Sequence, residues 1–172
     1  CLPAEVVARV RAEVEKQTGV TGANVLVCCT HTHTGPQTRA FQMPEESGPT
    51  GEWLRGFAER AAQAVAAAVE SLEPCGVSGA AVLEDRIAFN RRYRMKDGSV
   101  RTNTGYRNPG IVEPAAPIDP EVGVLAFTRA DGTTKALLVH YTCHLDNVGG
   151  AEISADYPGY LARRVAERLP DQ

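Results

Sequence analysis

The feature that most constrains the fold is a pair of Asp-Gly turns in the second half of the chain. Residues 96–99 are Lys-Asp-Gly-Ser, and residues 130–133 are Ala-Asp-Gly-Thr. An Asp-Gly pair between two strand-forming segments is a strong hairpin signal, because glycine readily adopts the positive φ that such a turn needs. The sequence therefore predicts two β-hairpins, the second of them formed by antiparallel strands at 122–129 and 135–142.

Three segments have apolar residues spaced three and four apart, which is typical of amphipathic helices. They are residues 3–17, 52–73 and 157–169. Apolar runs at 24–29 and 77–89 predict two more strands, which the long helix between them would join as a crossover unit. The predicted fold class is therefore α/β: a mixed β-sheet flanked by helices, in the order αβαββββα, with loops at 30–51 and 102–120.

Composition excludes several classes of function. The 172 residues are 43% hydrophobic, and 18 Lys+Arg against 21 Asp+Glu give a net charge of −3. A nearly neutral chain without a long basic run is a poor partner for nucleic acid. No apolar stretch approaches the roughly 18 to 20 residues that cross a bilayer, so no transmembrane segment is expected. Because the chain starts at Cys1 without an initiator Met, we interpret it as a piece of a longer protein.

The four histidines form two pairs, each at the end of a predicted strand. The first pair, His31 and His33, lies in Thr-His-Thr-His-Thr-Gly-Pro at 30–36. Residues two apart in an extended chain project to the same side, and ligand crevices lie at the carboxyl ends of strands. This pair therefore predicts a metal or acid/base site. The alternative is a solvated loop that happens to contain two histidines.

The second pair is His140 and His144, in His-Tyr-Thr-Cys-His-Leu-Asp-Asn at 140–147. We expect His144, which is further along the chain, to be the functional residue and His140 to have a structural or supporting role. Asp156 begins the last predicted helix, so it could cap that helix, orient an imidazole, or do both.

Two other features allow both a functional and a plain interpretation. Arg91 presents a planar guanidinium that suits an oxyanion, although it could equally be a solvated surface residue. Cys28 and Cys29 lie in an apolar run, where we expect free cysteines to be small buried hydrophobic residues. The alternatives are a bond between the two neighbouring cysteines and a redox role.

Four stretches, in this order, resemble the N-terminal catalytic domain of the neutral/alkaline non-lysosomal ceramidase family. They are HTHTGP (31–36), NRR (90–92), DPEVGVLAF (119–127) and HLDNVGGAEISADYPGY (144–160). The resemblance spans nearly the whole chain, and it implies that residues 1–172 are a fragment of such a metal-hydrolase domain.

The resemblance also implies an activity, namely zinc-dependent hydrolysis of the N-acyl bond of ceramide to sphingosine and fatty acid. It implies that His31 and His144 bind Zn²⁺, and that His33 and Arg91 are catalytic contacts to the substrate or to the developing oxyanion. A Glu and a Tyr ligand and a serine would follow downstream, so the remainder of the parent chain would complete the site. The alternatives are a metal-dependent hydrolase of another substrate on the same scaffold and a non-catalytic binding homologue.

Overall fold

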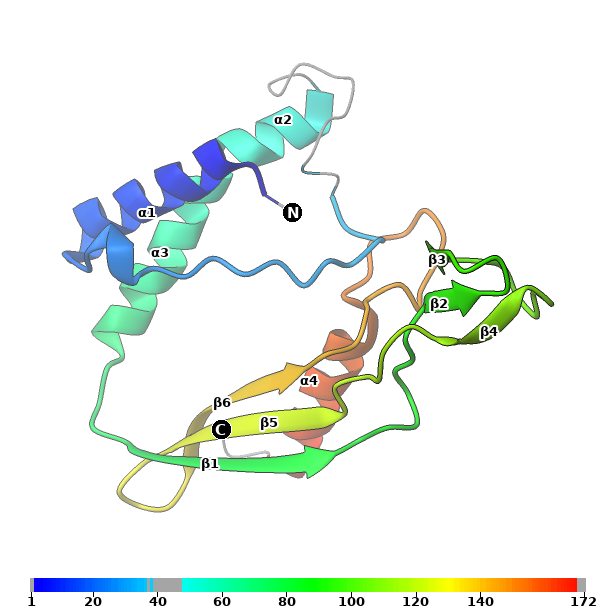
Figure 1. The fold of residues 1–172 in the computed structure, drawn as a ribbon. Helices are drawn as coiled ribbons and strands as arrows, with labels where there is room; N and C mark the ends of the chain where they lie inside the picture. Colours follow the sequence, from blue (N-terminus) through cyan, green and yellow to red (C-terminus); the bar gives the residue numbers. More distant parts are fainter. Residues whose placement is uncertain (1, 37, 39–47, 170–172) are drawn as a thin grey trace. The chain divides into compact units, whose positions relative to one another are not determined.

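The computed structural model describes residues 2–36, 38 and 48–169, and it contains both helices and strands (Figure 1). The chain is therefore α/β, as predicted, and the order of its elements broadly follows the predicted order. It divides into two compact units. The first takes in the chain up to Pro74 together with Leu145–Arg168, and the second is built mainly from Cys75–His144.

The first unit is helical. Its elements are α1 (Ala4–Thr18), the short 3-10 helix η1 (Gly22–Asn24), α2 (Gly48–Arg55), α3 (Phe57–Glu70) and α4 (Asp156–Arg168). Helix α1 packs against α3, and their buried side chains form the core of this unit: Val10, Val14, Ala58 and Ala62. Within the described part of the chain, no helix combines the length and the apolar character needed to cross a membrane.

The helix predicted at 52–73 is divided in two by Gly56. Helix α2 ends at Arg55 and α3 begins at Phe57, with Gly56 at φ −86° and ψ −3° between them. Glycine costs roughly 1 kcal/mol more than alanine in a helix interior, so it is a natural place for a break. The prediction that 52–73 is helical is confirmed, whereas the prediction of one continuous helix is wrong.

The strand predicted at 24–29 is absent, because that part of the described chain has no partner strand. Val25 and Val27 pack against the helical core, while Leu26 between them is 82% exposed. Cys28 and Cys29 are free and exposed, so the prediction that they are buried was wrong. Alternating apolar residues here reflect a single extended segment that lies along helices, and the predicted crossover unit is not formed.

The second unit contains two small antiparallel sheets. One has the order β1-β5-β6, and the other has the order β3-β2-β4. The strands are β1 (Gly76–Leu83), β2 (Arg92–Met95), β3 (Val100–Thr102), β4 (Ile111–Pro114), β5 (Glu121–Thr128) and β6 (Thr134–Tyr141). Both predicted hairpins are confirmed, and their turn glycines Gly98 and Gly132 have φ of 80° and 87°.

Two boundaries in the second unit differ from the predicted ones. Strand β1 stops at Leu83 instead of continuing to Phe89, and the predicted loop 102–120 contains β4. Strand β1 lies at an edge of its sheet, and all eight of its residues are exposed.

Candidate metal centre

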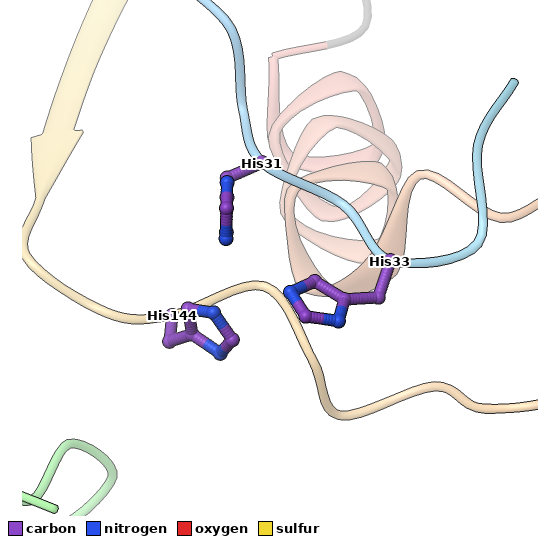
Figure 2. Close-up of side chains that lie close together, drawn as sticks. All are labelled: His31, His33 and His144. Atoms are coloured by element: carbon purple, nitrogen blue, oxygen red, sulfur yellow. The ribbon is translucent and has the colours of Figure 1, made fainter. Parts of the chain in front are cut away.

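The structure brings together three of the four histidines. His31, His33 and His144 each offer a ring nitrogen, and these nitrogens lie within 4.8 Å of one another. The His31 and His33 rings are 5.0 Å apart between centroids, at 73° to each other. Figure 2 shows the three rings around a common space. The two residues expected to bind metal, His31 and His144, are therefore neighbours, and His33 joins them.

His31 has an unusual backbone conformation. Its φ of 65° lies in the left-handed region, which residues with a side chain adopt only rarely. The extended geometry assumed from the sequence therefore does not explain why the His31 and His33 rings lie together. Such backbone strain is found preferentially at functional sites, where the surrounding structure holds it in place.

His33 is fixed through both its backbone and its side chain. Its N–H donates a hydrogen bond of 3.3 Å to the carbonyl oxygen of Leu145, the residue that directly follows His144. Its Nδ1 lies 3.3 Å from Oδ1 of Asp146. One short segment, 144–146, therefore supplies a clustered histidine, a backbone acceptor and a carboxylate.

Two threonines between and beside the histidines hold the loop in place. The carbonyl oxygen of Ser154 accepts hydrogen bonds from the hydroxyls of Thr32, at 3.0 Å, and Thr34, at 3.3 Å. In return, the N–H of Ser154 donates to the carbonyl oxygen of Thr34 at 2.9 Å. Thr34 is 7% exposed, so its hydroxyl is largely shielded from water. The alternating Thr-His pattern therefore combines anchoring residues with metal-ligand candidates.

Replacing Thr34 with valine is expected to lower the free energy of unfolding by about 1 kcal/mol, which is typical for one lost hydrogen bond. The loss stays modest because Thr32 still donates to the Ser154 carbonyl. A Thr32→Val/Thr34→Val double variant should lose more than the two single changes together. Urea denaturation measures this, with the exposed Thr102→Val as control. Strictly additive losses would contradict the shared-acceptor interpretation.

Asp156 connects the start of α4 to the turn at 147–148, which follows His144. Its side chain is buried, and the residue is 1% exposed. Oδ2 accepts the N–H groups of Asn147 at 2.8 Å and Val148 at 3.0 Å, and Oδ1 accepts that of Tyr157 at 2.6 Å. Desolvation by burial would raise the pKa of Asp156, but these N–H donors outweigh it and hold the pKa below its usual value.

The contacts of Asp156 clarify its predicted roles. It accepts a hydrogen bond from Tyr157 at the start of α4, and it also holds the turn at 147–148. Among the described contacts, the carboxylate beside an imidazole belongs to Asp146. Nothing in the sequence singles out Asp146 as the residue beside His33.

The other two candidates are His140 and Arg91. His140 is exposed on β6, opposite Gly123 of β5, so it is not a buried core histidine. Arg91 is exposed just before β2, and its carbonyl oxygen accepts the N–H of Asn103 at 3.2 Å. The contacts described for Arg91 are thus those of its own hairpin.

The donor set suits zinc. Imidazole nitrogens are preferred zinc ligands, and catalytic sites characteristically use three protein ligands with a fourth position open. Zn–N bonds of roughly 2.0–2.1 Å in a tetrahedron place nitrogens about 3.3 Å apart. The nitrogens lie within 4.8 Å of one another, so a rotation of the exposed His31 and His33 side chains would be needed to reach that spacing. Nε2 of His144 is buried, whereas the His31 and His33 residues are exposed.

No protein-family model, curated protein or solved structure matches this chain.

Proposed function

We propose that this chain contributes the histidine ligands of a zinc-dependent amide hydrolase that resembles the neutral ceramidases. The convergence of His31, His33 and His144 within 4.8 Å is the observation that carries this proposal. The motif resemblance adds the bond that is cleaved, the N-acyl bond of a ceramide-like lipid. The anchoring of the cluster by Thr32, Thr34 and Asp156 further supports a preorganised site.

Each residue has a definite task in this proposal. His31 and His144 hold the ion through ring nitrogens. Zinc at this centre would supply a Lewis acid and lower the pKa of a water ligand to about 7. The positively charged guanidinium of Arg91 can stabilise negative charge that develops on the amide carbonyl oxygen. The resemblance assigns His33 a substrate contact as well, and it places a Glu and a Tyr ligand in the parent chain.

Zinc removal tests the activity directly. Chelation of the full-length protein is expected to reduce hydrolysis of an N-acylsphingosine to background, and Zn²⁺ should restore it where Mg²⁺ does not, because Mg²⁺ prefers oxygen ligands. Release of fatty acid and sphingosine, measured by mass spectrometry, reports the reaction.

A substrate panel separates this proposal from its alternatives. Hydrolysis of a peptide or another non-lipid amide, without ceramide turnover, would identify a different hydrolase on the same scaffold. Retention of zinc with no hydrolysis of any panel member would identify a non-catalytic binding protein.

A further inference from the structure

The basic residues of the second unit are concentrated in its small sheet, β3-β2-β4 (Figure 1). Residues 91–114 contain six Arg or Lys side chains but only two acidic ones, so this segment has a net charge of +4. The whole chain has a net charge of −3, and the residues outside the segment therefore carry −7. A charge asymmetry of this kind within one chain indicates an interaction with an anionic surface.

Two of the six cations are neutralised by ion pairs within the sheet, Arg94 with Glu113 at 3.5 Å and Arg101 with Asp97. In the described part of the chain, no acidic side chain pairs with the other four. These four are the exposed residues Arg91, Arg92, Lys96 and Arg107. Since Arg91 already has a role in the proposed function, the other three are the cations that remain for an anionic partner.

Large apolar side chains are exposed beside these cations. Phe89, Tyr106 and Val112 are 76%, 88% and 60% exposed. The guanidinium carbon of Arg107 lies 5.0 Å from the centre of the Tyr106 ring, so the sheet presents a cation and an aromatic ring together. Aromatic and aliphatic side chains mixed with basic ones are typical of surfaces that bind the headgroup region of a membrane.

The turn that carries Tyr106 is held by its own hydrogen bonds. Asn108 donates from Nδ2 to the carbonyl oxygen of Thr104 at 2.7 Å, and its Oδ1 accepts the N–H of Gly110 at 2.8 Å. Arg107 has a φ of 53°, which residues with a side chain adopt only rarely. The exposure of Tyr106 and Arg107 is therefore a property of an ordered and locally strained turn, and such strain is found preferentially at functional sites.

A groove of about 470 Å³ adjoins the sheet. Its walls are mostly apolar and include Phe89 and residues 115–118, together with Arg94. The side chain of Asn90 donates to the carbonyl oxygen of Ala116 at 2.9 Å and so connects the two walls. Arg92 is two residues from Arg94 on the same strand, so both lie on one face of the sheet. An apolar groove beside cations matches an amphiphile with an acyl chain and an anionic headgroup.

We propose that the sheet β3-β2-β4, with this groove, is a docking surface for a membrane of anionic phospholipid. Arg92, Lys96 and Arg107 attract the anionic headgroups, Phe89 and Tyr106 enter the interface, and the groove takes an acyl chain. A membrane fits better than nucleic acid, because phosphates alone leave the exposed apolar side chains without a partner. The inference goes beyond the proposed function, since none of these residues belongs to the histidine cluster and lipid binding needs no zinc.

Cosedimentation of the full-length protein with vesicles is the first test. Binding to vesicles of phosphatidylcholine and phosphatidylserine should be at least about 10-fold tighter than binding to phosphatidylcholine alone. Raising NaCl from about 0.1 M to 1 M should remove most of this difference, because the Debye length falls from about 10 Å to 3 Å. Equal binding to both kinds of vesicle would overturn the proposal, as would binding to duplex DNA without binding to phosphatidylserine.

Neutralising two cations locates the surface. Arg92→Gln/Lys96→Gln is expected to weaken binding to phosphatidylserine vesicles roughly 30-fold, from the contribution of each basic residue near an anionic surface. The matched control Arg9→Gln/Lys16→Gln removes two exposed positive charges from α1 and should leave the binding unchanged. Equal losses in the two double variants would refute the proposal, because they would show a response to net charge alone.

The apolar contribution is tested at Phe89. Phe89→Ser is expected to weaken vesicle binding about 10-fold, since a phenyl ring would no longer leave water at the interface. Leu26→Ser is the control, because Leu26 is 82% exposed on the first unit and should not contact the lipid. The same loss in both variants would contradict the assigned surface.

Zinc removal separates this inference from the proposed function. Chelation should leave vesicle binding unchanged, so zinc content and vesicle binding can fail independently. A protein that binds zinc but no anionic vesicles overturns the docking surface alone. Vesicle binding that disappears together with the zinc would assign the lipid contact to the metal centre, and it would likewise overturn the proposal.

Discussion

Replacing His144 with alanine is expected to lower the zinc affinity of the full-length protein by more than about 100-fold, since loss of a direct ligand exceeds the 10- to 100-fold effect of its outer partners. Elemental analysis after dialysis and chelator competition both measure this. His140→Ala is the matched control, because it removes the same side chain from an exposed position on β6 outside the cluster.

His31 offers a sharper form of the same experiment. Its φ of 65° costs a residue with a side chain roughly 1–2 kcal/mol, a penalty that glycine does not have. His31→Gly should therefore lose zinc as completely as His31→Ala while folding at least as stably. Undiminished zinc content in both the His31 and the His144 variants would refute the metal-site assignment, and a fold that fails in His31→Gly would show that the imidazole has a structural role.

Replacing Asp156 with alanine is expected to lower the melting temperature by several degrees and to weaken zinc binding. The change removes the acceptor shared by the N–H groups of Asn147, Val148 and Tyr157, so the segment that follows His144 loses its attachment to α4. Thermal unfolding measures the first effect and chelator competition the second. Asp131→Ala is the control, because Asp131 also accepts a backbone N–H, that of Thr133, but in an exposed hairpin turn.

Acid should abolish the contribution of the Asp156 carboxylate to the free energy of unfolding. The pKa of Asp156 is lowered in the folded protein, so its stabilising effect is fully present above the ordinary aspartate pKa of about 3.9 and is lost as the pH falls through the lower native value. The difference in unfolding free energy between wild type and Asp156→Asn should therefore shrink below about pH 4. Urea titrations at stepped pH measure it, and a difference that grows on acidification would contradict the sign of the pKa shift.

The elements that the sequence predicts well depend on local chemistry. Gly98 and Gly132 define the two hairpins through their positive φ, and the spacing of Val6, Val10 and Val14 defines α1. The segment 24–29 has equally suggestive residues, but a strand also needs a partner, and pairing depends on residues far away in the chain. An apolar run can equally lie beside helices, as Val25 and Val27 do.

In the candidate site, too, features that depend on local sequence can be predicted, whereas contacts between distant residues cannot. His31 and His144 can be predicted as partners because each belongs to a recognisable motif. The contact of Asp146 with His33 cannot be predicted in this way. It depends on the hydrogen bond between the backbones of His33 and Leu145, which lie far apart in the sequence. The left-handed conformation of His31 is likewise invisible in the sequence, since histidine is not a residue that signals positive φ in the way glycine does.

The edge strand β1 affects how this protein can be handled. Gly76–Leu83 contains no charged residue and no proline, and it is exposed along its whole length. Natural proteins usually protect such an edge with lysines, prolines or bulges, because its free backbone groups recruit strands from other molecules. Self-association at the concentrations used for spectroscopy would mimic or mask a ligand-induced change. Dilution series, or a lysine placed at Ser78 to charge the edge, therefore belong in every binding experiment on this chain.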